Sequence, residues 1–306
     1  MNNLLITGGS GFLGKNLVKS FTNEKKYKIY YPSSKECDCT KIQSLKKFIK
    51  NKKINIIVHC AGFIGGINFS RLYPDKVFTN NLQMTTNVFE ISKEASIEKL
   101  IFINSACVYS DHYKKPFKEE QVWERQMHKS ARVYGISKYA ALIGADAFSK
   151  YNKIYINTIL TNLYGPGDKF DEEESHVIPS LISKFQNAKK KQSKIVELWG
   201  TGETIREFIY IEDCCKILKK IIKNHKKSDL INIGTGYGIK VKKLAKIISK
   251  LCNYKGNIVW NKNIENGSLY KVLSIKKLKN IYKYKPETDM DDGLRKTISW
   301  YEKKYL

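Results

Sequence analysis

The chain of 306 residues contains no hydrophobic run of membrane-spanning length, no internal repeat and no low-complexity segment. Its Met-Asn-Asn start leads directly into a strand-like run and not into a secretory leader. Seven cysteines include no CxxC pair, and their odd number argues against a disulfide framework or a structural zinc site. We therefore expect a cytoplasmic protein without a membrane partner or a metal, holding one large or two modest domains.

Acidic residues are scarce relative to basic ones. Lysine and arginine number 55 against 29 aspartates and glutamates, which gives a formal net charge of +26 at pH 7. Such an excess suits either nucleic acid or an anionic small molecule. The lysines are spread over most of the predicted helices, apart from the short run at 189–191. We therefore expect solvated helix faces and no nucleic-acid partner, with a positive field that attracts a nucleotide-sugar diphosphate.

Strand-like runs alternate with helical segments along most of the chain. The runs are NNLLIT, KIYY, INIIVHCAG, LIFINS, IYINTIL and LINIG. This alternation predicts an α/β fold, a Rossmann-type doubly wound parallel sheet with helices on both faces. After NLYGPGD the rhythm breaks into an acid-rich loop at 171–174, a helix from His176 and the strand-like IVELWG.

This break predicts two domains. We expect a dinucleotide-binding domain of residues 1–164 plus about 199–236. A smaller, discontinuous substrate domain of about 165–198 plus 237–306 would then cover the carboxyl ends of the strands, where ligands of such sheets bind.

Three glycines, Gly8, Gly11 and Gly14, follow the first strand-like run and precede a helical segment, with Phe12 and Leu13 between them. Glycines at this spacing allow a tight turn, close approach of backbone to a pyrophosphate and tight helix packing. With a second strand at 27–31, the pattern predicts dinucleotide binding by these five residues. The alternative is a purely structural glycine turn.

The turn after the second strand bears on the cofactor. It holds Ser33, Ser34, Lys35 and Glu36. Hydroxyls and a lysine suit the 2′-phosphate of NADP(H), whereas an acid there would bind the ribose 2′-hydroxyl of NAD(H). We expect NADP(H), bound here by Ser33, Ser34 and Lys35, and NAD(H) remains open because of Glu36.

Tyr134 and Lys138 stand four residues apart in VYGISKYAA, and Ser105 ends the run LIFINS. On a helix this spacing places phenol and ammonium on one face, so the cation would lower the phenol pKa from about 10. Moving a hydride onto or off a carbonyl carbon requires such a proton donor or acceptor, and Ser105 would hydrogen-bond the same oxygen. Taken alone, an aromatic residue and a lysine at this spacing are more often a core edge and a solvated charge.

The whole chain resembles the extended short-chain dehydrogenase/reductase family, through TGGSGFLG, the set Ser105, Tyr134 and Lys138, NLYGPGD and INIGTG. Within it, AGFIGGI, YPDKVFTNN, NSACVYS, SHVIP and WGTGETIREF resemble the GDP-L-fucose synthase branch. The resemblance implies NADP(H)-dependent conversion of a GDP-4-keto-6-deoxy-mannose-type sugar to GDP-L-fucose or a close relative. It also implies a homodimer formed through helices flanking the active-site helix.

The resemblance further implies roles for individual residues. Ser105, Tyr134 and Lys138 would form the reductase site, and Lys138 would also hold the cofactor ribose. Cys107 and His176 would move protons at C3 and C5 of the sugar, where a C4 ketone makes both carbons acidic. Cys107 becomes a usable base only beside a cation or a helix terminus, whereas His176 titrates near neutrality unaided.

Binding residues are implied in the same way. Lys184 and Arg206 would contact the nucleotide diphosphate, Trp199 the sugar or base, and Asn162 the nicotinamide and sugar. For Lys184 and Arg206 the alternative is a surface ion pair, and for Trp199 a core position. The remaining histidines have no identifiable partner and are expected to be structural; they are His59, His112, His128 and His225.

Three departures from the branch keep alternatives open. Pro32 and Ser34 stand where arginines are expected, MHKSARVYG lacks a proline-rich approach, and Tyr270 and Ser274 replace arginine and aspartate. One alternative is a C4 reductase only, acting on another GDP-4-keto sugar such as a heptose of a capsule pathway. A regulator that senses nucleotides or binds RNA is disfavoured by the intact Ser105, Tyr134 and Lys138 set.

Overall fold

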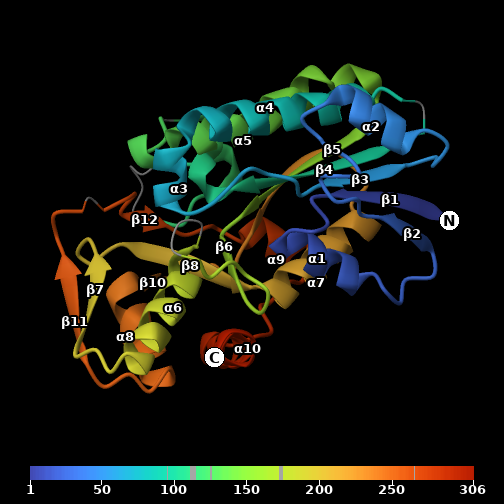
Figure 1. Cartoon of the computed structure of the whole chain (residues 1–306). Helices are drawn as coiled ribbons and strands as arrows, with labels where there is room; N and C mark the ends of the chain where they lie inside the picture. Colours follow the sequence, from blue (N-terminus) through green and yellow to red (C-terminus); the bar gives the residue numbers. More distant parts are fainter. Residues whose placement is uncertain (95, 111–114, 125, 172–174, 265) are drawn as a thin grey trace.

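The structure is a computed structural model that describes residues 1–306 except 95, 111–114, 125, 172–174 and 265 (Figure 1). Most of the acid-rich loop expected at 171–174, and His112, therefore lie outside the described residues. Within the described part, no helix combines the length and apolar character that crossing a membrane requires.

A parallel six-stranded sheet forms the larger part of the molecule. In sheet order its strands are β2 (Tyr27–Tyr30), β1 (Asn2–Thr7), β3 (Ile56–His59), β4 (Lys99–Ser105), β5 (Ile154–Leu160) and β9 (Asp229–Ile233). Each of the six strand-like runs in the sequence forms one of these strands. The predicted Rossmann-type parallel sheet is confirmed.

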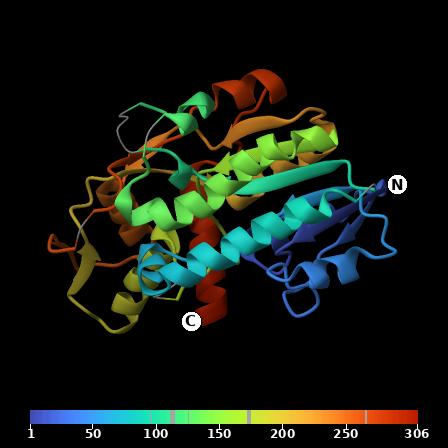
Figure 2. The same cartoon turned by 90° about the horizontal axis from the view of Figure 1, so that it is seen from above.

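Helices cover both faces of this sheet (Figures 1 and 2). One face carries α2 (Ile42–Ile49), α4 (Pro74–Ile91) and α5 (Arg132–Ala147), and the other carries α1 (Phe12–Ser20), α7 (Ile211–Asn224) and α9 (Lys276–Tyr282). Strand side chains alternate between the two cores: Leu4 packs in one with Leu17 of α1, whereas Leu5 packs in the other with Val88 of α4. The sheet is therefore buried on both sides, as its apolar runs require.

A smaller part of the molecule is built from the remaining strands and helices. Its strands are β6 (Asn162–Tyr164), β7 (Ile195–Trp199), β8 (Ile205–Tyr210), β10 (Gly238–Lys240), β11 (Asn257–Asn261) and β12 (Tyr270–Lys271). Its helices are α6 (Val177–Lys190), α8 (Val241–Leu251) and α10 (Met290–Tyr305). Phe185, Leu244 and Leu294 share a separate core here. Ile275 and Leu278 pack instead against the core of the large sheet, and the domain boundaries stay a prediction.

The carboxyl ends of the central strands meet at one edge of the sheet. Thr7 of β1 lies opposite His59 of β3, and Ser105 of β4 lies opposite Leu160 of β5. The glycine turn follows β1, the short helix α3 (Ile67–Leu72) comes after β3, and a 3₁₀ turn, η1 (Ala106–Val108), follows β4. Ligands of open parallel sheets bind at this edge. Of the predicted catalytic residues, Ser105 ends β4 here and Cys107 lies in η1.

Candidate active site

The glycine turn between β1 and α1 is built from backbone at positions where a side chain would not fit. Gly8 has φ +67°, and a Cβ there would lie 2.6 Å from the backbone nitrogen of Ala61. A Cβ on Gly14 would lie 2.1 Å from the carbonyl oxygen of Gly8. Gly11 precedes α1 without capping it by a side chain, so the first N–H groups of the helix, including those of Phe12 and Leu13, point into this turn. This cradle fits the diphosphate of a dinucleotide.

In the turn after β2, the acidic residue Glu36 is hydrogen-bonded within the turn itself. One carboxylate oxygen of Glu36 accepts hydrogen bonds from the backbone N–H and the hydroxyl of Ser33, both at 2.8 Å. The bonds from Ser33 lower the pKa of the Glu36 carboxyl. Ser34 and Lys35 are exposed on the same turn. The carboxylate is thus occupied by the Ser33 backbone, while the lysine faces solvent.

Tyr134 and Lys138 lie one turn apart on α5, with the Lys138 Nζ 5.8 Å from the centre of the Tyr134 ring. Ser105 ends β4, and its hydroxyl accepts a hydrogen bond from the Cys107 backbone N–H at 3.2 Å. The η1 turn packs directly on α5, because a Cβ on Gly135 would lie 2.8 Å from the Cys107 carbonyl oxygen. Because Gly135 has no side chain, the turn that holds Cys107 lies close to the helix that holds Tyr134.

The electrostatics of this helix differ from the sequence expectation. Burial raises the pKa of the Tyr134 hydroxyl above its ordinary value, and the Cys107 thiol adds to the rise. Burial likewise lowers the pKa of Lys138 to about 8. The expected lowering of the phenol pKa by Lys138 is therefore wrong for this structure, because desolvation outweighs the attraction of a cation beside the ring. Tyr134 is a neutral phenol at neutral pH, which is the proton-donating form.

Cys107 lies within electrostatic reach of Arg206 from β8. Burial lowers the pKa of the Arg206 guanidinium to about 10, and the negative form of Cys107 opposes that shift. The Arg206 side chain also donates to the carbonyl oxygen of Ile205 at 2.9 Å. The tertiary structure thus brings a cation from β8 into the electrostatic surroundings of Cys107.

His176 is the residue immediately before α6. Its neighbour Ser175 packs against the loop after β3, since a Cβ on Gly66 would lie 2.6 Å from the Ser175 carbonyl oxygen. Burial lowers the pKa of the His176 imidazole, and the charge of Lys169 adds to the effect. The expectation that His176 titrates near neutrality unaided is therefore corrected. Its imidazolium is a stronger acid than that of an exposed histidine.

The predicted substrate residues Lys184, Trp199 and Arg206 lie on three elements, α6, β7 and β8. The Lys184 ammonium of α6 donates to the Glu197 carbonyl oxygen at 3.1 Å and lies 5.4 Å from the Trp199 ring centre. Trp199 is 51% exposed at the end of β7. In the described part of the chain, Trp199 makes no ring contact or hydrogen bond with Tyr134 or Arg206. In this structure Lys184 therefore lies beside Trp199, whereas Arg206 interacts electrostatically with Cys107.

Asn162, at the start of β6, donates its amide to the Glu207 carbonyl oxygen at 2.8 Å. Glu207, next to Arg206, is fully buried, and sequence reasoning missed it. Its carboxylate accepts hydrogen bonds from backbone N–H groups, including Gly236 at 2.7 Å and Leu273 at 2.6 Å. These bonds attach β8, the strand that carries Arg206, to two loops that are distant in sequence. The sequence feature that could have identified Glu207 is an acidic residue at the start of the otherwise apolar run EFIYI.

Two of the departing positions, Tyr270 and Ser274, lie against Phe117, the first through its ring and the second through its backbone. The Tyr270 ring lies 6.0 Å from the Phe117 ring, and the Ser274 backbone N–H donates to the Phe117 carbonyl oxygen at 2.7 Å. His59, expected to be structural, is 2% exposed and bonds Thr7 Oγ1 through Nδ1 at 2.8 Å. Burial lowers the pKa of His59 to about 3, so the ring stays neutral.

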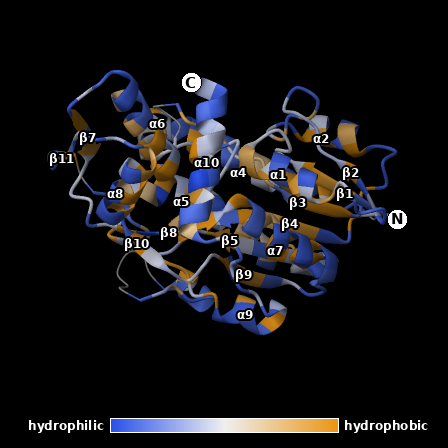
Figure 3. Ribbon diagram, turned by 90° about the horizontal axis from the view of Figure 1, so that it is seen from below, coloured by the Kyte–Doolittle hydropathy of each residue, from blue (hydrophilic) through white to orange (hydrophobic). Residues whose placement is uncertain are grey.

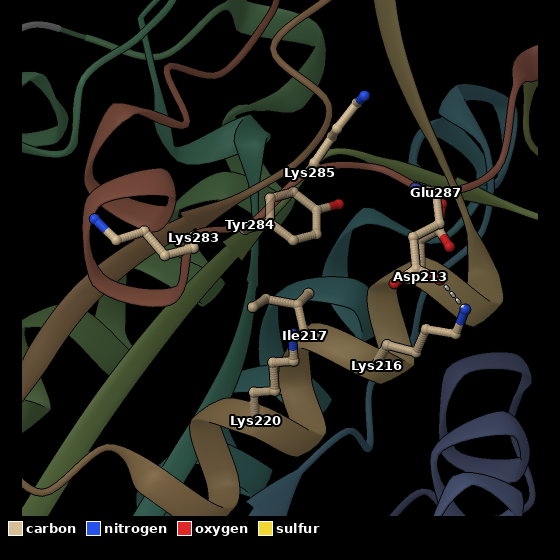
Figure 4. Close-up of a pocket in the computed structure, with 8 residues that line it drawn as sticks. All are labelled: Asp213, Lys216, Ile217, Lys220, Lys283, Tyr284, Lys285 and Glu287. Atoms are coloured by element: carbon tan, nitrogen blue, oxygen red, sulfur yellow. Dashed lines mark hydrogen bonds and ion pairs between the residues drawn. The ribbon is translucent and has the colours of Figure 1, made fainter.

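The hollows of the described structure include a larger and a smaller one that can be compared with the predicted site. A cleft of about 440 Å³ lies beside the glycine turn, with Gly11 and Phe12 in its lining. A smaller cavity of about 190 Å³ lies between α7 and residues 283–287 (Figure 4). The smaller one holds the ion pair of Lys216 with Glu287 at 2.5 Å, and none of the predicted site residues lines it. The glycine-turn cleft is therefore the one connected with the predicted site.

Comparisons with known proteins agree with this geometry. Residues 4–234 match the model of the NAD dependent epimerase/dehydratase family. The chain is 32% identical to GDP-L-fucose synthase of Sinorhizobium fredii, over 95% of this chain and 93% of that protein. It is 31% identical to GDP-L-colitose synthase of Yersinia pseudotuberculosis, over 97% of each.

A solved structure shows the same arrangement of elements. It is a GDP-6-OMe-4-keto-L-xylo-heptose reductase from C. jejuni, 25% identical, with a TM-score of 0.88 over 99% of this chain and 98% of that one. With a family model covering most of its length and relatives above 30% identity, the chain belongs to the NAD dependent epimerase/dehydratase family, as an extended short-chain dehydrogenase/reductase close to GDP-L-fucose synthase.

Proposed function

We propose that this protein is an NADP(H)-dependent 3,5-epimerase/4-reductase, converting a GDP-4-keto-6-deoxy-mannose-type sugar to GDP-L-fucose or a close relative. The observation that carries the proposal is the convergence of three elements on Cys107. A neutral phenol, Tyr134, comes from α5, and a guanidinium, Arg206, comes from β8. One thiol thus lies within electrostatic range of both a proton donor suited to a ketone oxygen and a cation suited to a phosphate.

Reduction at C4 needs a proton donor at the ketone oxygen. The bound cofactor supplies the hydride. Tyr134 donates its phenolic proton to the oxygen as negative charge develops there, and the Ser105 hydroxyl donates a second hydrogen bond to the same atom. Lys138, whose pKa of about 8 keeps it charged at neutral pH, holds the ribose through its ammonium.

Epimerisation at C3 and C5 needs a base on one face of the sugar and an acid on the other. In its thiolate form, Cys107 removes the proton from the carbon next to the ketone. The electron pair passes to the ketone oxygen, where Tyr134 and Ser105 stabilise the enolate. The His176 imidazolium then returns a proton to the carbon from the opposite face.

The runner-up function is a C4 reductase that acts on another GDP-4-keto sugar, such as a GDP-keto-heptose of capsule biosynthesis. Its supports are the likeness to the C. jejuni heptose reductase and the presence of Tyr270 and Ser274 where the branch is expected to carry arginine and aspartate. In that case Cys107 and His176 bind the sugar without inverting it.

One experiment separates the two functions. The protein is incubated in heavy water with NADPH or NADH and a panel of GDP-4-keto sugars, and the products are analysed by NMR. We expect deuterium at C3 and C5 of a reduced product. Reduction without deuterium at either carbon for every sugar would favour the reductase alone, and no turnover of any GDP-4-keto sugar would contradict both.

We further propose a homodimer formed through α4 and α5. Ile136 and Ile143, two turns apart on α5, are 44% and 50% exposed, and Phe78 of α4 is 42% exposed. Apolar side chains at this spacing form one stripe, which a second copy would bury. Sedimentation velocity of the parent and of Ile143→Glu tests this, with a shift from dimer to monomer expected. The cytoplasmic location stays a prediction.

A further inference from the structure

The cleft beside the glycine turn is closed on its far side by the last helix of the chain. Figures 1 and 3 show α10 running between the α6 and α8 group and α1. The cleft of about 440 Å³ is lined by Gly11 and Lys15 of the α1 region, residues 167–171, and Tyr301, Lys304 and Tyr305 of α10. Three stretches far apart in sequence therefore surround the N-terminus of α1.

Cations from each of these stretches line the cleft. They are Lys15, Lys169 and Lys304. The Lys304 ammonium lies 4.7 Å from the Trp300 ring centre and 4.9 Å from that of Tyr305, which holds it over the aromatic end of α10. The uncapped N–H groups of α1 add partial positive charge to the same space. This combination favours an anion with oxygens on more than one side.

Asp168 is the buried acid of the cleft. It is 6% exposed, and one of its oxygens accepts the Lys169 backbone N–H at 2.8 Å. The other carboxylate oxygen is buried without a hydrogen-bond partner. Burial raises the pKa of Asp168 to about 7, against the opposing effect of Lys169. Below neutral pH the carboxyl is therefore largely protonated and does not repel an anion.

We propose that this cleft binds the diphosphate of the dinucleotide from the side opposite the glycine turn, with Lys304 as the cation supplied by the C-terminal helix and Asp168 as a group that must be uncharged for tight binding. The inference rests on the proposed cofactor. The glycines and the first turn of α1 contact one side of the diphosphate. Lys304 contacts the other side across the cleft, and Lys15 and Lys169 flank it.

A diphosphate also occurs in the GDP-sugar, so the source must be distinguished. The cleft takes its lining from the glycine turn, whereas the predicted GDP-sugar residues Lys184 and Arg206 do not line it. The dinucleotide is therefore the expected occupant. Binding of NADPH and NADH should weaken equally on loss of Lys304, because their diphosphates are identical, and binding of GDP should not change.

The test measures affinity directly, by fluorescence titration of NADPH and NADH and by calorimetry for GDP, without turnover. Lys304→Ala should weaken both dinucleotides about 5- to 10-fold. Lys303→Ala, an exposed neighbour outside the cleft, is the matched control and should have no effect. Circular dichroism confirms that both variants are folded.

A second arm uses pH. NADPH affinity of the parent should fall as pH rises from 6 to 8, through the range in which Asp168 ionises, and Asp168→Asn should remove this component. The other charged or titratable groups of the cleft are Lys15, Lys169, Lys304, Asp171, Tyr301 and Tyr305.

The outcomes separate this proposal from the proposed function. Tight NADPH binding by the parent with unchanged affinity in Lys304→Ala would overturn the role of α10 and leave the enzyme assignment intact. Weaker binding of GDP and not of NADPH would assign the cleft to the sugar nucleotide and overturn the proposal. A parent that binds neither dinucleotide would overturn both.

Discussion

The Ser105 hydroxyl oxygen accepts the backbone N–H of Cys107 at 3.2 Å, so a residue at the end of β4 fixes the thiol that follows it. Because the serine oxygen is the acceptor in this bond, its own proton remains available for a ketone oxygen. The reductive and the proposed epimerising groups are thereby held by one 3₁₀ turn. A change in that turn should affect both activities together.

Tyr134→Phe should reduce turnover by about 10²-fold or more, because only the transferable proton is lost. Affinity for the cofactor should stay within a few-fold of the parent. Steady-state rates and cofactor titrations measure the two effects. Tyr139→Phe on the same helix is the control and should retain turnover. Near-parental rates in Tyr134→Phe would remove Tyr134 from the chemistry.

Lys138 should make cofactor affinity sensitive to alkaline pH. Burial lowers its pKa to about 8, so the ammonium is present below that pH and is lost as pH rises through it. The dissociation constant of NADPH should therefore increase between pH 7.5 and 9. Lys138→Met should bind more weakly and show no such increase. A parent with constant affinity across this range would contradict the ribose-binding role.

The turn after β2 should select NADPH over NADH, because Lys35 is exposed there while Glu36 is bonded to Ser33. Lys35→Glu should reduce or invert the preference by placing a second carboxylate beside the 2′-phosphate. The ratio of kcat/KM values for the two cofactors is the measurement. Lys25→Glu, with the same change of charge before β2, should leave the ratio unchanged. A parent that prefers NADH would mean that Glu36 binds the ribose.

Cys107→Ser should abolish solvent deuterium exchange at C3 and C5, because a serine hydroxyl is a far weaker base than a thiolate. Reduction of the unepimerised 4-keto sugar should survive, since Tyr134 is untouched. His176→Asn should retain partial exchange, because removal of the proton by Cys107 still occurs. NMR of products formed in heavy water at equal enzyme concentration compares the three proteins. Full exchange in Cys107→Ser would assign the base elsewhere.

Glu207→Gln should destabilise the fold by about 1–3 kcal/mol. Both carboxylate oxygens accept backbone N–H groups, including those of Gly236 and Leu273, and the amide nitrogen of glutamine would face one of these donors. Urea unfolding followed by circular dichroism gives the free energy of unfolding. The control is Glu203→Gln, an exposed acid paired with Lys240, and it should leave the midpoint nearly unchanged. Equal stability of Glu207→Gln and parent would show that these bonds are dispensable.

The sequence by itself determined the large sheet and its cofactor turn. Alternating apolar runs and helical segments are local patterns, and each such run became one parallel strand. Gly8 and Gly14 are likewise local requirements, because Gly8 has φ +67° and a Cβ on Gly14 would collide with the Gly8 carbonyl oxygen. The four-residue spacing of Tyr134 and Lys138 fixed their common helix face for the same reason.

Only the tertiary structure decided the electrostatics of the site and the elements that surround it. Burial, which depends on the packing of the whole chain, raised the pKa of Tyr134 where spacing alone predicted a decrease. The approach of Arg206 to Cys107 joins strands about a hundred residues apart, and no local pattern encodes it. The same holds for Lys304, which the course of α10 brings to the glycine turn. Desolvation and long-range proximity are properties of the folded chain, whereas periodicity and steric room are properties of short segments.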